Sequence, residues 1–262
     1  MPFGQRPRHA GKGTFLPRIL SYNVRRCLGM DGMLSPARIA AVIAEYRPDI
    51  VALQELDVRR IRSDSIDQAH EIARELDMRH VYFNATLRVM EEEYGDAVLT
   101  MLPSRLVKAG PLPGLSHRPA LEPRGALWAA VEVDGVELQV INTHLGLGRA
   151  ERLAQAEALL GEEWLGHPHC RNPAILLGDF NSLPSGRVYK RLASRLRDAQ
   201  VIAPAKGRAQ ATFPSLLPML RIDHVFVSRG IKVLDARRIG SPLARVASDH
   251  LPLLVDFELT AE

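Results

Sequence analysis

Polar side chains follow several short apolar segments of this chain, at the point where each segment ends. Gln54 and Glu55 follow the apolar residues 50–53, and Asp179 and Asn181 come just after residues 175–177. The pattern recurs at Asn23, at Asn142 and His144, at Asp223 and His224, and at Ser248, Asp249 and His250. Loops at strand ends present side chains to ligands, so these residues could form one pocket. Carboxylate and amide oxygens of that kind suit Mg²⁺ or Mn²⁺ better than zinc.

Each of these residues also has an ordinary structural explanation. A single carboxylate at a strand end is more often a turn or cap residue, and a single histidine is usually a hydrogen-bonded structural group. The collection as a whole is harder to explain in that way, so the sequence predicts a carboxylate-and-amide pocket. The two cysteines, Cys27 and Cys170, do not form a zinc pattern such as C-x2-C.

The segments that must position these residues are a mixture of strands and helices. Short apolar or alternating runs predict strands at residues 18–24, 50–53, 80–85, 96–102, 125–133, 136–145, 174–177, 221–228, 231–239 and 251–259. Apolar residues at helical spacing predict helices at residues 36–46, 66–76, 149–165 and 188–196. Asp134-Gly135 predicts a two-residue hairpin turn. Together these elements predict mixed sheets flanked by helices in one α/β domain.

The composition is that of an ordinary globular protein. Of its 262 residues, 46% are hydrophobic and 24% are charged, which excludes disordered and fibrous classes. No apolar run approaches the roughly 18 residues of a membrane span, so no integral span is expected. Two cysteines cannot build a disulfide framework, so we expect a reducing, cytoplasmic environment, with a single bridge left open. The formal charge of +4 mildly favours anionic partners.

Residues 1–17 are expected to form a flexible basic tail ahead of a domain that spans residues 18–262. The tail contains Arg6, Arg8 and Lys12, no acidic residue, and no apolar core of the length that a secretory signal needs. A frayed chain end is favoured over a basic arm that contacts phosphates.

Six short segments occur in order along the chain: Ser21-Tyr-Asn-Val24, Leu53-Gln-Glu55, Asn142-Thr-His-Leu145, Gly178-Asp-Phe-Asn181, Arg221-Ile-Asp-His224 and Ser248-Asp-His-Leu251. In these segments the chain resembles the endonuclease/exonuclease/phosphatase superfamily, the DNase I-like metal-dependent phosphoesterases, and in particular its small bacterial-type members. Gly95-Asp-Ala-Val98 is similar to the family's glycine-asparagine-alanine segment, with Asp96 in place of the usual asparagine. The resemblance implies an α/β DNase I-like four-layer sandwich, in which two packed mixed β-sheets are flanked by helices.

The resemblance also implies a metal site. Glu55 matches the family's metal-binding glutamate, Asn23 stands beside it, and Asp249 matches an aspartate that completes this site. Together they would hold Mg²⁺ or Mn²⁺, which would polarise a phosphoryl oxygen and stabilise charge on the transition state.

Four further matches imply catalytic roles around the phosphate. Asp179 and Asn181 match the pair that positions the attacking water and binds the phosphate or a second metal. His250 matches the histidine beside the scissile phosphorus, Asp223 matches the carboxylate that orients it, and His144 matches a phosphate-contacting histidine. An Asp–His pair is a sensible base or donor near neutral pH, because the carboxylate fixes the tautomer and raises the basicity of the imidazole. Either Asp179 or His250 could take the proton of the water.

Two further polar residues each have a structural interpretation beside the functional one. Arg124 aligns loosely with a family segment near the substrate, so it is a candidate phosphate contact, with a surface salt bridge as the alternative. His224 directly follows Asp223, and successive side chains of a regular strand point to opposite faces. We therefore interpret His224 as structural.

The sequence leaves the phosphate-ester substrate open. The apolar residues of the segment 215–220 either pack inward or form an exposed lip that meets lipid, and peripheral membrane contact stays open with them. Arginines on early loops, among them Arg25 and Arg26, could instead bind a nucleic-acid backbone. We expect a divalent-metal-dependent phosphodiester hydrolase, with a lipid headgroup or small phosphodiester slightly favoured as substrate. A DNA or RNA nuclease, a phosphomonoesterase and, more remotely, a non-catalytic phosphate-binding module are the alternatives. The oligomeric state is not predicted.

Overall fold

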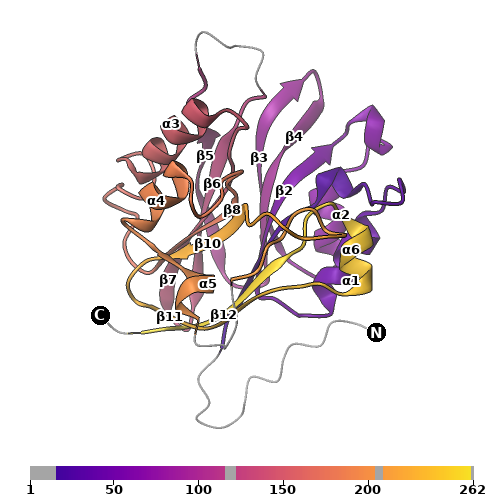
Figure 1. The fold of residues 1–262 in the computed structure, drawn as a ribbon. Helices are drawn as coiled ribbons and strands as arrows, with labels where there is room; N and C mark the ends of the chain where they lie inside the picture. The colour runs from indigo at the N-terminus through magenta and orange to yellow at the C-terminus, as the bar shows by residue number, and fades with distance from the viewer. Residues whose placement is uncertain (1–15, 116–121, 204–208, 261–262) are drawn as a thin grey trace.

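Two six-stranded β-sheets pack against each other in the computed structural model, which describes residues 16–115, 122–203 and 209–260 (Figure 1). The predicted basic tail lies outside the described residues up to position 15. The first sheet has the order β11 (Ile231–Arg238), β12 (Leu253–Leu259), β1 (Arg18–Asn23), β2 (Ile50–Val58), β4 (Glu92–Thr100) and β3 (His80–Val89). The second sheet has the order β5 (Ser104–Pro111), β6 (Gly125–Val133), β7 (Val136–His144), β8 (Ala174–Asp179), β10 (Asp223–Val227) and β9 (Arg197–Asp198).

Both sheets are mixed, and their central strands are the apolar runs of the sequence. In the first sheet β1 runs parallel to β2 and antiparallel to β12. In the second sheet β8 runs parallel to β7 and antiparallel to β10, and every residue of β8 is buried. A strand covered on both faces has no polar side to alternate with, which is why β8 reads as a continuous apolar segment.

Helices cover the outer face of each sheet. The helices α1 (Pro36–Ala44), α2 (Gln68–Glu75) and α6 (Pro242–Ala247) pack on the first sheet, and α3 (Arg149–Leu160) and α4 (Arg187–Ala193) pack on the second. The short α5 (Ala199–Ile202) follows β9, and two 3-10 turns, η1 (Arg25–Cys27) and η2 (Ile61–Ser63), follow β1 and β2. The resulting order of helices, sheet, sheet and helices confirms the predicted DNase I-like four-layer sandwich.

Three apolar cores hold these layers together: one under α1, α2 and α6, one between the sheets, and one under α3 and α4. The two cysteines belong to different outer layers, since Cys27 is buried in the first core and Cys170 packs beside the third. Both are free thiols, so the single bridge that the sequence left open is not formed between them.

The predicted strands are all present, and the differences lie in short elements at the edges. The strand β5 and the two-residue β9 were not predicted; β5 mixes charged and apolar residues and forms the edge of its sheet. The six-residue α6 was not predicted either, because it is shorter than two full turns and offers too few apolar positions to show a period. The helix predicted to run to residue 165 ends at Leu160, before Gly161.

The predicted hairpin is confirmed between β6 and β7, where Val133 pairs with Val136. Its two central residues, Asp134 and Gly135, have φ angles of 49° and 77°, which the right-handed twist of a two-residue hairpin requires. None of the helices in the described part of the chain is long and apolar enough to cross a membrane.

Candidate active site

The register of the central strands brings the predicted polar residues to one edge of both sheets. In the first sheet Asn23, the last residue of β1, pairs with Gln54 of β2. In the second sheet Asp179, the last residue of β8, pairs with His144 of β7 on one side and with Asp223 of β10 on the other. Parallel neighbours end at the same edge, so residues that are distant in the sequence meet in the structure.

A buried polar clamp fixes the two sheets at this edge. The side-chain amide of Asn142 donates hydrogen bonds to the backbone oxygens of Leu53 and Ala97 in the other sheet, each at 2.9 Å. Gln54 donates in return to Asn142 Oδ1 at 2.8 Å. These buried groups have partners in the opposite layer, and hydrogen bonds are directional. They therefore fix the position of β2 relative to β7 in addition to apolar packing.

Glu55 leaves the strand ladder to reach the site. It lies in the irregularity between Leu53 and Leu56, where the register of β2 against β4 shifts, and its φ is 61°. A bulge turns a side chain out of the regular alternation, so Glu55 points into the polar edge while its neighbours Leu53 and Leu56 remain in the core. Burial raises the pKa of the Glu55 carboxyl, and the hydrogen bond from Asn23 opposes this effect.

Asn23 joins the two halves of the site. Its amide nitrogen donates to Glu55 Oε1 at 2.8 Å and to Asp179 Oδ2 at 3.1 Å. Its amide oxygen accepts the backbone N–H of Arg25 at 3.1 Å, which fixes the orientation of the amide. In this arrangement Asn23 orients two carboxylates from the two sheets.

Gly178 allows β8 to approach β7 closely just before Asp179. Its φ is 139°, and a Cβ at this position would lie 1.9 Å from the backbone oxygen of Thr143. Asp179 itself is held by the backbone N–H of Asn181, which donates to Oδ1 at 2.8 Å. Burial and the nearby carboxylate of Asp223 raise the pKa of Asp179 to about 7.

Asp223 and His250 form a buried pair beside Asp179. His250 Nδ1 lies 2.9 Å from Asp223 Oδ2, and His250 Nε2 lies 3.7 Å from Asp179 Oδ2. Thr212 donates a hydrogen bond to the same Asp223 oxygen, and the ring of Phe213 packs 4.8 Å from the imidazole centroid. Burial by itself lowers the pKa of His250, but the charges of Asp223 and Asp179 outweigh it and raise the pKa to about 10.

His144 differs from His250 because burial and two nearby cations act on its ring, although carboxylates of Glu55 and Asp179 also lie 3.9 and 3.5 Å away. Burial, followed by the charges of Arg124 and His250, holds the pKa of His144 well below its usual value, so the ring is neutral. Arg124 Nη1 lies 3.0 Å from His144 Nδ1, and a guanidinium can only donate. The ring proton therefore sits on Nε2, which lies 3.5 Å from Asp179 Oδ2; the amide nitrogen of Asn181 is 3.1 Å away but is itself a donor, and it donates to the backbone oxygen of Leu145 at 2.9 Å.

Arg124 is buried and also forms an ion pair with Glu122 at 2.8 Å. The salt bridge that the sequence offered for it is present, and the same guanidinium nitrogen also contacts His144 inside the site; a phosphate contact of Arg124 stays a prediction. Its Nε has no hydrogen-bond partner among the described residues, which leaves a buried donor in the site.

Asp249 lies at the outer side of the site. Its carboxylate is 3.5 Å from Arg25 Nε and accepts a 3.4 Å hydrogen bond from Ser248. It is near enough to Glu55 for its charge to raise the pKa of that residue. All nine predicted site residues therefore belong to one connected group, from Asn23 and Glu55 in the first sheet to Asp179 and Asp223 in the second.

Asp96 was noted in the sequence only as a departure from the family segment, and the structure places it directly under the site. It is buried in β4, and its carboxylate accepts a hydrogen bond from the backbone of Glu55, at the bulge. Burial raises its pKa to about 8, with the charge of Arg124 acting in the opposite direction. The position opposite a bulge depends on strand pairing, so the segment Gly95-Asp-Ala-Val98 was the sequence signal that could have indicated it.

His224 lies on the opposite face of β10 from Asp223. It is fully buried against the rings of Phe180, Tyr189 and Phe226, and its Nε2 lies 2.8 Å from the backbone oxygen of Ser182. These contacts are those of a core residue, and none of them is to a residue of the site.

Two groups of donors could hold a cation at this edge. Oxygen and nitrogen atoms of Asp179, Asp223 and His250 lie within 4.8 Å of one another. However, Asp223 and His250 already pair with each other at 2.9 Å. Glu55 and Asp249 instead offer two partly exposed carboxylates, with side-chain exposures of 25% and 27%, and the charge of Asp249 raises the pKa of Glu55. This all-oxygen pair matches the preference of Mg²⁺ and Mn²⁺, so the predicted ligands fit the ion.

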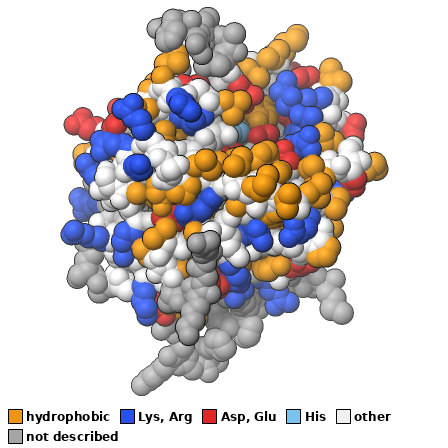
Figure 2. Space-filling model, in the orientation of Figure 1, with side chains coloured by type: hydrophobic (Ala, Val, Ile, Leu, Met, Phe, Trp, Pro, Cys, Tyr) orange, Lys and Arg blue, Asp and Glu red, His pale blue; other side chains and the backbone are white. Residues whose placement is uncertain are grey.

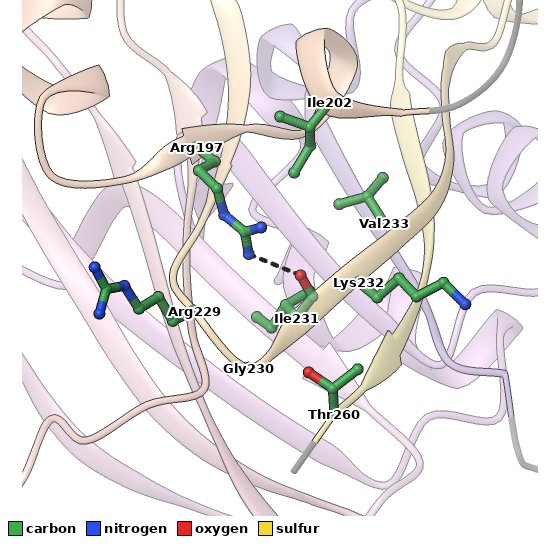
Figure 3. Close-up of a pocket in the computed structure, with 8 residues that line it drawn as sticks. All are labelled: Arg197, Ile202, Arg229, Gly230, Ile231, Lys232, Val233 and Thr260. Atoms are coloured by element: carbon green, nitrogen blue, oxygen red, sulfur yellow. Dashed lines mark hydrogen bonds between the residues drawn. The ribbon is translucent and has the colours of Figure 1, made fainter. Parts of the chain in front are cut away.

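A cavity of about 320 Å³ lies elsewhere and shares no residue with the site (Figure 3). Its lining residues come from β9, α5, the turn before β11, the start of β11 and the residue after β12: Arg197, Ile202, Arg229, Gly230, Ile231, Lys232, Val233 and Thr260. Arg197 is engaged there with the backbone oxygens of Ser228 and Ile231, at 2.7 and 2.8 Å. The cavity therefore carries no part of the chemistry described above.

Comparisons with known proteins agree with this fold. A solved endonuclease/exonuclease/phosphatase from Beutenbergia cavernae DSM 12333 has a TM-score of 0.77 at 25% identity, covering 94% of this chain and 72% of that one. The mannosyl-6-phosphatase Bt3783 of Bacteroides thetaiotaomicron VPI-5482 has a TM-score of 0.72 at 22% identity, covering 93% of this chain and 100% of that one.

The curated relatives match a shorter part of the sequence. The protein YbhP of Escherichia coli (strain K12) is 30% identical over 142 residues, which are 53% of this chain and 54% of YbhP. The chain thus spans about half the length of the curated relatives it matches. The model of the Endonuclease/Exonuclease/phosphatase family, by contrast, matches residues 20–250. Since that match runs from β1 to His250 and includes every predicted site residue, this chain belongs to the endonuclease/exonuclease/phosphatase family.

Proposed function

We propose that this protein is a Mg²⁺- or Mn²⁺-dependent phosphodiester hydrolase. Members of the family are phosphoesterases that generally use divalent metals. The observation that carries the proposal is the pair of Asp223 and His250, 2.9 Å apart, with Asp179 3.7 Å from the other imidazole nitrogen. Such a group can move a proton and stabilise a developing negative charge beside a phosphate.

In this proposal Asp179 accepts the proton of the attacking water, and His250 donates a hydrogen bond to the phosphate. With a pKa near 10, His250 is an imidazolium at neutral pH and can donate to a phosphoryl oxygen. Asp179 has a pKa near 7, close to the operating pH that suits a general base. Asp223 orients the imidazole. The reverse assignment, with His250 as the acceptor, is the alternative.

The phosphate is held by neutral and cationic groups on the second sheet. Neutral His144 presents its Nε2 proton toward Asp179 and the site, and Asn181 lies beside that ring, with its amide donating to the backbone oxygen of Leu145 at 2.9 Å. Arg124 supplies positive charge and an unpaired Nε donor. Together these three residues are the proposed phosphate contacts.

Glu55 and Asp249 are the proposed metal ligands, and Asn23 keeps Glu55 in place. When bound, the cation supplies Lewis-acid stabilisation to a phosphoryl oxygen. The charge of Asp249 repels that of Glu55, whereas His250 and Arg124 act on Glu55 in the opposite direction and Arg25 lies 3.5 Å from Asp249. A divalent ion would offset that repulsion.

The proposal is tested with bis-p-nitrophenyl phosphate as a generic diester. Turnover should require Mg²⁺ or Mn²⁺ and stop on addition of EDTA. Asp179→Asn and His250→Gln should each lower kcat by about 10²- to 10⁴-fold, the usual size of a proton-transfer contribution. His70→Ala, which removes a histidine that is two-thirds exposed, is the matched control and should leave turnover unchanged. Full activity in either site variant, with an unaltered circular dichroism spectrum, would refute its assigned role.

The substrate class is the open part of the proposal. A lipid headgroup or a small phosphodiester is placed ahead of nucleic acid and phosphomonoesters, since apolar residues 216, 217 and 219 are exposed beside the site. A panel of sphingomyelin, glycerophospholipids, DNA, RNA and phosphomonoesters, assayed with each divalent ion, separates these classes.

A non-catalytic module is disfavoured because Glu55, Asp179, Asp223 and His250 are all present and mutually oriented. Two free cysteines support a cytoplasmic location.

A further inference from the structure

Exposed apolar side chains gather on two loops beside the site, and we call this group the apolar lip: Met30, Met33, Leu216, Leu217 and Met219. Met33, Leu217 and Met219 are 64%, 66% and 67% exposed. Figure 2 shows hydrophobic side chains spread across the face in view, next to acidic and histidine side chains and flanked by Lys and Arg. Single exposed apolar residues are common, but a group of large ones beside a site marks an interaction surface.

The two loops of the lip are joined to each other. The loop 28–34 is closed by a bridge between Leu28 and Leu34, and the backbone N–H of Met30 donates to Val246 of α6 at 2.8 Å. From the same helix, Arg245 donates to the backbone oxygens of Ser215 and Leu216 at 3.0 and 3.1 Å. The helix α6 therefore fixes both loops, and the lip is one surface.

The lip is also fixed to the segment that contains Asp249 and His250. The loop 213–220 is closed by a bridge between Phe213 and Leu220, and the backbone N–H of Ser215 donates to the backbone oxygen of Asp249 at 2.7 Å. The ring of Phe213 packs on His250 at 4.8 Å. Whatever contacts the tip of this loop is therefore presented to His250 and Asp249.

The charge around the lip is positive. The segments 24–38, 212–220 and 241–249 contain four arginines, Arg25, Arg26, Arg38 and Arg245, and two acids, Asp31 and Asp249. The acids are paired, Asp31 with Arg38 at 2.6 Å and Asp249 with Arg25 at 3.5 Å. Among the described residues, no carboxylate lies within 4.0 Å of Arg26 or Arg245, so the three segments around the lip carry an excess of positive charge.

We infer that the apolar lip docks on a membrane surface that contains anionic lipid, and that the substrate is a phosphate ester held at that surface. Leucine and methionine side chains enter the boundary between headgroups and acyl chains, while neighbouring arginines remain at the level of the anionic headgroups. The docked lip brings His250 and Glu55 to the headgroup layer. The docking itself does not depend on catalysis, and only the choice of substrate rests on the function proposed above.

Vesicle sedimentation tests the docking directly. The metal-free protein, in EDTA, is mixed with vesicles of phosphatidylcholine alone or with 30% phosphatidylserine at 0.1 M NaCl. We expect binding to the anionic vesicles and release at 0.5 M NaCl, because salt screens the arginines. The double variant Leu217→Ser/Met219→Ser should lower the partition coefficient at least tenfold. Val201→Ser, at a 63% exposed position on α5 outside the lip, is the matched control and should bind as the original chain does.

Several outcomes would overturn the inference. Wild-type protein that stays in the supernatant with anionic vesicles does so, as does a double variant that binds them fully. A dimer that the double variant converts to monomer, without vesicle binding by either, would show that the lip contacts a second copy instead. Unchanged urea midpoints verify that the variants fold. Vesicle binding without hydrolysis of bis-p-nitrophenyl phosphate would refute the proposed function alone, and hydrolysis without vesicle binding would refute the docking alone.

Discussion

At the scale of single residues, two histidines of the same site are held in opposite charge states by their neighbours. His250 lies between the carboxylates of Asp223 and Asp179, which raise its pKa to about 10. His144 lies beside Arg124, and burial together with that charge lowers its pKa well below the usual value. One imidazole can therefore donate as a cation while the other acts as a neutral hydrogen-bonding group.

The charge state of His250 is directly measurable. In the metal-free protein, NMR titration of His250 should give a pKa several units above the ordinary value of 6.5, and Asp223→Asn should lower it by more than one unit. The raised pKa also means that the pair contributes to the free energy of unfolding. This contribution is fully present below pH 6.5 and is lost as pH rises toward 10, the raised pKa. The exposed His70 provides the reference titration in the same spectra. A His250 pKa at or below 6.5 would contradict the assignment.

At the scale of elements, the site depends on two local features that bring strands together: the polar clamp across the sheets and the glycine at the end of β8. Asn142 carries the clamp, with two donated hydrogen bonds of 2.9 Å to the opposite sheet. Gly178 allows β8 to lie against β7 at the position where Asp179 and His144 pair. Each feature acts on the site through the backbone.

Loss of the clamp should weaken the packing of the two sheets. Asn142→Ala leaves the backbone oxygens of Leu53 and Ala97 and the amide of Gln54 without their partner, so we expect the free energy of unfolding to fall by about 2–4 kcal/mol. Urea denaturation measures this. Glu132→Ala, at an exposed position of β6, is the control and should change stability by no more than about 0.5 kcal/mol. An equal effect of both substitutions would argue against the clamp.

A side chain at position 178 should separate β8 from β7. Gly178→Ala places a Cβ 1.9 Å from the Thr143 oxygen at a φ of 139°, so it should destabilise the protein by more than about 3 kcal/mol and reduce activity through Asp179. Gly110→Ala is the matched control, since its Cβ would meet nothing within 4 Å. Thermal unfolding and diester turnover are the measurements; a Gly178→Ala variant as stable and active as the control would contradict the close approach.

At the scale of the whole molecule, the fold gathers acids from both sheets at a single edge and leaves an apolar lip beside them. Glu55 and Asp96 come from the first sheet and Asp179 and Asp223 from the second, with Asp249 on the loop before β12. Burial raises the pKa of Glu55, Asp96 and Asp179. Such a concentration of carboxylates opposes folding unless a cation is present.

Divalent cations should therefore stabilise the folded chain. At a Mg²⁺ or Mn²⁺ concentration 100 times its Kd, the added stability is about 2.7 kcal/mol, and the melting temperature should rise by several degrees. Glu55→Gln should abolish most of the rise, whereas Glu163→Gln, at an exposed glutamate, should retain it. Differential scanning fluorimetry at constant ionic strength measures the effect. A rise of the same size in Glu55→Gln would place the cation elsewhere.

The sequence by itself determined that mixed sheets are flanked by helices, and its resemblance to a known family implied the four-layer sandwich and the types of residue in its site. The apolar runs fixed the central strands, and the six short segments named Asn23, Glu55, His144, Asp179 and His250 as candidates, because buried strands and strand-end polar groups leave local patterns. It did not indicate edge elements such as β5 and α6, whose patterns are short or mixed.

Only the tertiary structure decided how these groups act on one another. That Asn23 donates to carboxylates of both sheets, that Asp96 lies under the Glu55 bulge, and that residues 28–34 and 213–220 form one exposed lip all depend on contacts between segments far apart in the chain. Charge states, burial and shared surfaces are set by distances in space. No local pattern encodes those distances, so the same residues acquire their chemistry only once the two sheets have packed together.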